Sequence, residues 1–126
     1  VGPRLVLSTP DELRLVLRWI AILHGRVDAD LAATTGIHTA EEAVKAVLAG
    51  ADVTMMASAL LRHGPEQLTR VRDGLAAWLR EGGYESVAQA RGSLSQRKAA
   101  DPSAFERSSY MRTIVGYTAD WLAAHP

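Results

Sequence analysis

The chain has 126 residues, with 14 Lys and Arg against 14 Asp and Glu, and it contains no cysteine. A 48% hydrophobic and 22% charged composition at this length is that of one folded globular domain. The lack of cysteine excludes a disulfide framework, a cysteine nucleophile and a thiolate metal site, and the zero net charge gives no general attraction to nucleic acid. No apolar run is long enough to span a bilayer and no signal-peptide pattern is present, so we expect a cytoplasmic protein.

The first predicted element is a helix over residues 10–24. Thr9 is a suitable N-cap, Pro10 fits the first helical position, and Glu12 completes a capping box. Two faces of this helix are apolar, whereas a helix on the outside of a domain needs only one apolar stripe. We therefore expect it to be covered twice, either by a further part of the protein or by a second subunit in a homo-oligomer.

A strand–helix–strand unit follows. Strands are predicted over residues 28–35 and 52–57, and a helix over residues 40–49. The second strand is apolar almost throughout, which is typical of a strand covered on both faces, so Met55 and Met56 are expected in the core. The crossover between the strands has the length of a right-handed βαβ unit, and the strands should therefore be parallel.

The remainder of the chain is predicted to be helical. The expected elements are a helical turn at 58–61, a helix at 65–81, a short helix at 85–91, a polar loop at 92–100 and a last helix from Asp101. Two parallel strands leave both outer edges of their sheet open. Because strands alternate with helices, we interpret the chain as one end of a larger α/β fold, and its start at Val1 rather than Met agrees with a fragment.

Candidate ligand-binding residues follow both predicted strands. Gly36 lets backbone amides approach an anion, and the Ser58 hydroxyl and nearby amides should face the same edge of the sheet. In (β/α)8 barrels the loops after strands 7 and 8 frequently form a phosphate site. Ser58 is interpreted as an N-cap rather than a nucleophile. His38 and His63 flank this edge and are expected to be solvated, and no metal-binding spacing occurs.

Several motifs carry a resemblance to a known family. They are AATTGIHTAEE at 32–42, LAGAD at 48–52, MASAL at 56–60, Gly64-Pro65 and Tyr84-Glu85-Ser86-Val87. Together they resemble the C-terminal end of dihydroorotate dehydrogenases, most closely the bacterial dihydroorotate dehydrogenase-like branch. The resemblance implies that residues 1–92 form the C-terminal portion of an FMN-binding (β/α)8 TIM barrel. Residues 93–126 would form a helical C-terminal tail.

The resemblance also implies an activity and a cofactor site. Members of this family oxidise a dihydropyrimidine in pyrimidine biosynthesis, and they hold the FMN phosphate at positions that match Thr35, Gly36, Ala57 and Ser58. Two positions depart from the family, because Thr35 replaces a usual glycine and Ala57 replaces a frequent aromatic residue. The family's catalytic base and its flavin-contacting Lys lie on earlier strands. The chain is therefore expected to hold cofactor phosphate, to contain no catalytic residue and to be inactive alone.

Two other interpretations stay open at this stage. The chain could be the phosphate-binding end of another (β/α)8 enzyme that acts on a sugar phosphate instead of using FMN. It could also be a non-catalytic interaction module whose apolar helix at 10–24 docks on a partner.

Overall fold

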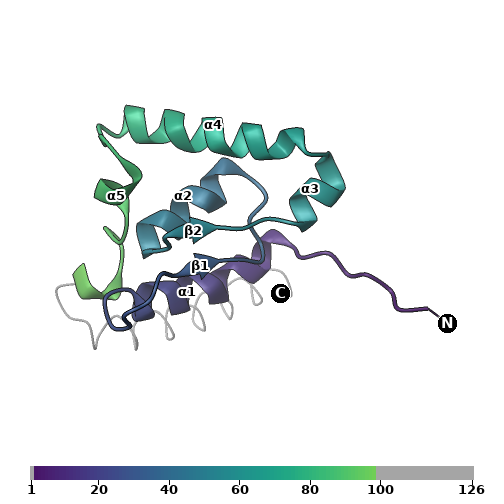
Figure 1. Cartoon of the computed structure of the whole chain (residues 1–126), viewed down its shortest axis with the longest axis horizontal. Helices are drawn as coiled ribbons and strands as arrows, with labels where there is room; N and C mark the ends of the chain where they lie inside the picture. The colour runs from purple at the N-terminus through teal and green to yellow at the C-terminus, as the bar shows by residue number, and fades with distance from the viewer. Residues whose placement is uncertain (1, 99–126) are drawn as a thin grey trace, which may run out of the picture.

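The computed structural model of the protein describes residues 2–98 (Figure 1). The elements in chain order are the 3-10 helix η1 (Pro10–Glu12), helix α1 (Leu13–Leu23), strand β1 (Ala32–Ala33), helix α2 (Ala40–Ala49), strand β2 (Val53–Thr54), helices α3 (Ser58–His63), α4 (Glu66–Glu81) and α5 (Val87–Ala90), and the 3-10 helix η2 (Gln96–Lys98). The predicted helix from Asp101 lies outside the described residues. Helix α3 is longer than the single turn expected at 58–61.

The first helical segment and α2 begin where the sequence predicts because their capping boxes are local. Before η1, the Thr9 amide and hydroxyl donate to Glu12 Oε1 over 2.8 and 3.5 Å. Before α2, the Thr39 amide and hydroxyl donate to Glu42 Oε2 over 2.5 and 2.6 Å. Both capping boxes satisfy amides that the first turn of a helix leaves unpaired.

The second capping box predicts a specific dependence of stability on pH. Partial burial raises the pKa of Glu42, but hydrogen bonds from Thr39 and His38, with the nearby His38 charge, outweigh it and leave the pKa below its usual 4.5. A lowered pKa in the folded state stabilises the fold above pH 4.5, and this contribution is lost as the pH falls through the folded-state pKa. Glu42→Gln keeps the cap but cannot titrate.

We therefore expect the difference in unfolding free energy between the natural chain and Glu42→Gln to be constant near neutral pH and to shrink below pH 4.5. Urea unfolding at a series of pH values measures this difference. Because every other carboxylate is shared by the two proteins, a difference that does not change with pH would contradict the role given to Glu42.

Both strands are much shorter than predicted. They pair in parallel, with Ala32 beside Val53 and Ala33 beside Thr54, and α2 forms the crossover between them. The parallel βαβ prediction is confirmed, but the strand bounds 28–35 and 52–57 were too long. A strand needs a hydrogen-bonded neighbour, and each of these has one such neighbour among the described residues.

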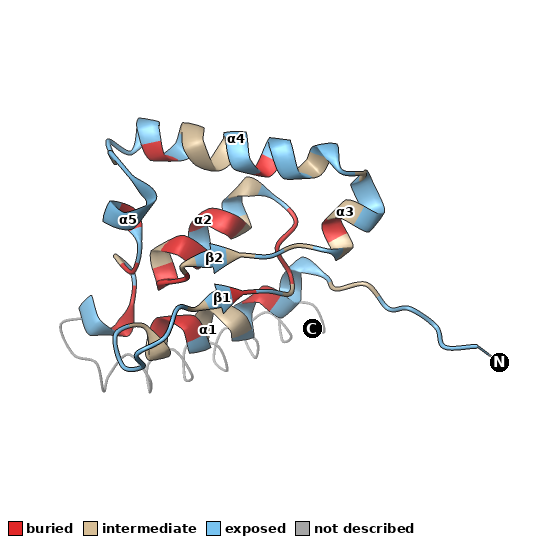
Figure 2. Cartoon of the chain, in the orientation of Figure 1, coloured by how far each residue is buried: buried red, intermediate tan, exposed pale blue. Residues whose placement is uncertain are grey.

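The helices form a layer against the sheet. Helix α2 lies between α1 and α4, while α1 contacts β1 and α2 contacts β2. The buried residues gather where these helices meet each other and the sheet, as the red segments of Figure 2 show. Small side chains line this core, including Ala33, Ala43 and Ala46, each with no exposed surface, which lets α2 approach both neighbours closely.

Two apolar surfaces are open in the described part of the chain. On β2, Val53 and Met55 are each 53% exposed, so the prediction of a strand covered on both faces is wrong for residues 2–98. Met56 packs against the core as expected, whereas Met55 does not. On α1, Leu15 and Trp19 are 64% and 53% exposed, which is the second apolar face that the sequence predicts.

The segment after α5, predicted as a polar loop, is partly buried and contains the 3-10 helix η2. Ser95 and Gln96 are buried, because the chain folds back over the end of α2. The amides of Gly92 and Leu94 donate to the carbonyls of Val47 and Leu48 over 3.0 and 2.9 Å. These carbonyls belong to the last turn of α2, where few helical amides remain as donors, and the Val47 carbonyl also accepts from the Gly50 amide over 3.0 Å.

Candidate functional site

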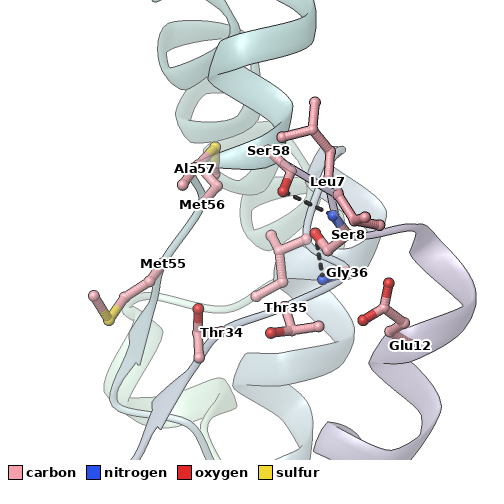
Figure 3. A pocket seen from close by; sticks show the side chains of 12 residues that line it. Leu7, Ser8, Glu12, Thr34, Thr35, Gly36, Met55, Met56, Ala57 and Ser58 are labelled. Atoms are coloured by element: carbon pink, nitrogen blue, oxygen red, sulfur yellow. Dashed lines mark hydrogen bonds between the residues drawn. The ribbon is translucent and has the colours of Figure 1, made fainter. Parts of the chain in front are cut away.

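A cavity of about 350 Å³ lies where β1 and β2 end (Figure 3). Its described lining residues are Val6, Leu7, Ser8, Glu12, Thr34, Thr35, Gly36, Ile37, Met55, Met56, Ala57 and Ser58. The four residues predicted to hold a cofactor phosphate, Thr35, Gly36, Ala57 and Ser58, are all among them. The parallel pairing explains this convergence, because the carboxyl ends of parallel strands meet at one edge of the sheet.

The loop after β1 has an unusual backbone. Thr35 and Gly36 adopt successive left-handed conformations, with φ angles of 76° and 77°. Glycine enters this region without strain, whereas a β-branched residue such as threonine is a genuine outlier there. Thr35 thus takes a glycine-like conformation at the position where the resembled family usually has glycine.

We expect Thr35→Gly to stabilise the chain despite the greater flexibility of glycine in the unfolded state. Strain at a non-glycine left-handed residue costs about 1–3 kcal/mol, and the unfolded-state cost of glycine is about 0.4–1 kcal/mol. The unfolding free energy should therefore rise by about 1 kcal/mol, which is measured as a higher urea midpoint. Thr34→Gly is the control, since it adds the same flexibility at a neighbouring residue that has no positive φ, and it should lower the unfolding free energy. A lower unfolding free energy in both variants would contradict strain at Thr35.

Two serine hydroxyls tie the walls of the cavity together. The Ser8 amide donates to Ser58 Oγ over 3.0 Å, and the Gly36 amide donates to Ser8 Oγ over 3.4 Å (Figure 3). Each hydroxyl oxygen accepts an N–H, so each O–H hydrogen can be donated to a further acceptor in the cavity.

The serine geometry corrects one prediction and adds one residue. Ala57, not Ser58, is the N-cap of α3, and no side chain caps this helix. Ser8 was not predicted as a site residue. Its position directly before the Thr9 capping box, at the end of an apolar stretch, was the available signal, because such a position often marks the carboxyl end of a strand.

The described cavity lining is polar but carries little charge. Glu12 is its one ionisable side chain, and its Oε1 already accepts hydrogen bonds from Thr9. An anion in this cavity would therefore be held by the dipoles of amides and hydroxyls rather than by Lys or Arg.

The histidines near this edge behave differently from each other. His63 is exposed, as predicted, but His38 is only 5% exposed, so its predicted solvation is wrong. The His38 amide donates to Glu42 Oε2 and its carbonyl accepts from Gln67 Nε2, so the loop is bound to α2 and α4. The buried Nε2 atom of His38 has no hydrogen-bond partner within the described structure. Neither histidine lines the cavity.

Two other features are absent from residues 2–98. No group of three or more His, Cys, Asp or Glu side chains could hold a metal ion. No helix combines the length and the apolar character that crossing a bilayer requires.

Comparisons with known proteins agree with this geometry. The quinone-type dihydroorotate dehydrogenase of Rhodococcus opacus is 36% identical over 93 residues, which cover 72% of this chain and 26% of that protein. The enzyme of the same name from Xanthobacter autotrophicus is 37% identical over 90 residues, or 71% of this chain and 24% of that protein. The chain is related to the dihydroorotate dehydrogenases.

The structural comparison leads to the same family. Ligand-free dihydroorotate dehydrogenase from Eimeria tenella superposes with a TM-score of 0.62 and 25% sequence identity, over 68% of this chain and 24% of that one. No protein-family model matches. This dihydroorotate dehydrogenase-related chain spans about a quarter of the length of the curated relatives named above.

Proposed function

We propose that the chain supplies the last two βα units of a (β/α)8 barrel in an FMN-dependent, dihydroorotate dehydrogenase-like oxidoreductase. Its role would be to hold the phosphate of the cofactor. The observation that carries this proposal is the cavity at the ends of β1 and β2, which gathers Thr35, Gly36, Ala57 and Ser58. In this proposal residues 1–92 belong to the barrel and residues 93–126 form its C-terminal tail.

The donor set of the cavity suits a phosphate group. The hydroxyls of Ser8 and Ser58 each keep a hydrogen to donate, and those of Thr34 and Thr35 line the same space. Phosphate oxygens are acceptors, so these groups would satisfy them without a cationic side chain. Glu12 would not compete for the donors, because its Oε1 is held by Thr9 at the start of η1.

The proposal separates binding from chemistry. Bound FMN would supply the hydride acceptor for oxidation of a dihydropyrimidine in pyrimidine biosynthesis, in the cytoplasm. This chain's own residues would orient the cofactor through its phosphate, and none of them would transfer a proton. We accordingly expect the 126-residue chain alone to show no dehydrogenase activity.

A titration followed by NMR tests the site directly. Adding FMN to the ¹⁵N-labelled chain should shift the amide resonances of Gly36 and Ser58, because these residues line the cavity. Riboflavin, which lacks the phosphate, should shift them much less. Ser58→Ala should weaken FMN binding at least about tenfold, since one lost hydrogen bond to a charged group costs roughly 1.5 kcal/mol or more. Leu68→Ala, a change on the exposed side of α4, should leave binding unchanged.

The same titration separates the alternatives. Equal shifts with inorganic phosphate and with FMN would favour a barrel enzyme that binds a sugar phosphate, because the flavin ring would then add nothing. No shift with any of these ligands would contradict phosphate binding. If a Trp19→Ala change then dissolved an oligomer, the interaction-module interpretation would stand, because Trp19 belongs to the exposed face of α1.

A further inference from the structure

Helix α1 has an apolar outer face that stays exposed in the described part of the chain. The inner face of the helix is buried in the core through Leu13 and Ile20. On the outer face Leu15 and Trp19 are 64% and 53% exposed, and Ile22 is partly buried. These three positions are four and three residues apart, so they form one stripe along the helix. An apolar stripe that includes a tryptophan typically contacts another surface.

The described chain ends beside the C-terminal end of this helix. The 3-10 helix η2 contacts α1. Its Arg97 side chain lies against Gly25, where a Cβ atom would be 2.9 Å from Arg97 Nη1, and Gly25 comes directly after the C-cap of α1. Figure 1 shows this end of the described chain, in green, next to the end of α1. Residues 99–126 therefore start at the C-terminal end of α1.

The sequence of residues 99–126 contains an apolar stripe of its own. A helix is expected from Asp101, with Pro102 at the first helical position. Polar residues occupy one side of such a helix, among them Ser109, Thr113 and Asp120. The stripe is formed by residues at spacings of four, three and four, namely Tyr110, Ile114, Tyr117 and Trp121. An amphipathic helix of this kind needs a surface that covers its apolar face.

The two stripes match in length, direction and spacing. A helix over residues 102–121 would extend about 30 Å, whereas the eleven residues of α1 extend about 16 Å, so the second helix can cover all of the first. Because residues 99–126 start at the C-terminal end of α1, a helix that folds back along α1 runs antiparallel to it. Both stripes repeat at four and three residues, so the side chains of one helix can pack between those of the other.

We propose that residues 102–121 form a helix that docks antiparallel on the outer face of α1 and covers Leu15 and Trp19. This segment is favoured over a second copy because it starts beside the face, which gives it a high effective concentration there. The docked helix holds α1 on the side away from Leu13, the residue that abuts Gly36 in the cavity lining. Docking needs no ligand, so the inference holds or fails separately from the proposed flavin site.

Thiol labelling tests the cover in the full 126-residue chain, because the natural chain has no cysteine. Leu15→Cys places a thiol on the covered face, and Leu68→Cys places one on α4, where the leucine is 55% exposed. A covered thiol reacts only when the cover opens. We expect the thiol at position 15 to be alkylated about tenfold more slowly than the thiol at position 68. Burial of one aliphatic side chain stabilises by about 1.5–3 kcal/mol, and about 1.4 kcal/mol gives a factor of ten.

Two variants of the Leu15→Cys chain identify what covers α1. Ile114→Asp places a charge in the apolar stripe and should raise the labelling rate about tenfold, to the rate at position 68. Ser109→Asp places the same charge on the polar side and should leave labelling slow. Equal rates at positions 15 and 68 before either change, or the same effect of both changes, would overturn the inference. Protection that weakens on dilution would overturn it too, because a second copy would then cover α1.

A nitroxide label gives a second readout in which both stripes are intact. Thr113→Cys places the label beside the stripe of the docked helix. The amide signals of Leu15 and Trp19 should lose more intensity than that of Arg80 on α4, because α2 separates α4 from α1. Equal losses would contradict docking even if the Ile114→Asp chain failed to fold. The same losses in a ¹⁵N-labelled natural chain, mixed with spin-labelled chain, would assign the contact to a second copy and overturn the inference.

Discussion

Replacing Gly36 by alanine is expected to cost about 3 kcal/mol of unfolding free energy, the sum of a steric and a backbone term. A Cβ atom at Gly36 would lie 2.6 Å from the amide nitrogen of Leu13 and 2.9 Å from its Cβ. Leu13 is buried at the start of α1, so it cannot move without displacing that helix. The φ angle of 77° adds strain for any residue with a Cβ.

The matched control separates the two terms. Gly83 has a φ angle of 74°, but a Cβ there would meet nothing within 4 Å. Gly83→Ala should therefore lose only the backbone term, about 1–2 kcal/mol. Urea unfolding followed by tryptophan fluorescence measures both variants. Equal losses would show that contact with Leu13 does not restrict Gly36, and the close approach of α1 to the cavity would then be wrong.

Helix bounds were predictable because the signals that set them are local. The capping boxes at Thr9 and Thr39 each join residues three apart, and these bonds form in the structure as the sequence suggests. A helix also contains its own hydrogen-bond partners, so its periodicity can be interpreted without knowing its neighbours.

Strand length and burial were less predictable because they depend on distant partners. Apolar residues at 52–57 indicate that something covers both faces of the strand, but they do not identify it. Among the described residues only one face is covered, and Val53 and Met55 are exposed. His38 gives the opposite error, because its burial comes from Gln67 and Glu42 on two separate helices.

The candidate site was predictable in position but not in full composition. Parallel strands bring Gly36 and Ser58 to one edge, and this follows from the βαβ order alone. The contribution of Ser8 depends on hydrogen bonds to residues 28 and 50 positions away. Such contacts leave no periodic signal in the sequence, so the place of Ser8 in the cavity lining became visible only in the structure.

A second large loss of unfolding free energy is expected on substitution of Gly92, because the His24 ring lies between Gly92 and Gly50. A Cβ at Gly50 would lie 2.4 Å from His24 Cγ, and a Cβ at Gly92 would lie 2.3 Å from His24 Nε2. The ring also makes a 3.1 Å hydrogen bond from Nδ1 to the Gly50 carbonyl. The imidazole thus joins the ends of α1 and α2 to the segment after α5.

Gly92→Ala should therefore cost about 3 kcal/mol in the natural chain, from overpacking against the ring and from a positive φ. In a His24→Ala background the ring is absent, and the same change should cost only the backbone term of about 1–2 kcal/mol. A double-mutant cycle from four urea unfolding curves measures the difference. We expect a coupling of about 1–2 kcal/mol, within the range found for residues in contact.

The cycle isolates the contact because the other terms cancel. The φ angle of 73° at Gly92 and the hydrogen bond from its amide to the Val47 carbonyl are present in both backgrounds. The loss of the His24 hydrogen bond to Gly50 likewise appears in both His24→Ala proteins and is subtracted. Additive effects would therefore mean that the ring does not fill the space above Gly92. The buried packing of the segment after α5 against α1 would then need another cause.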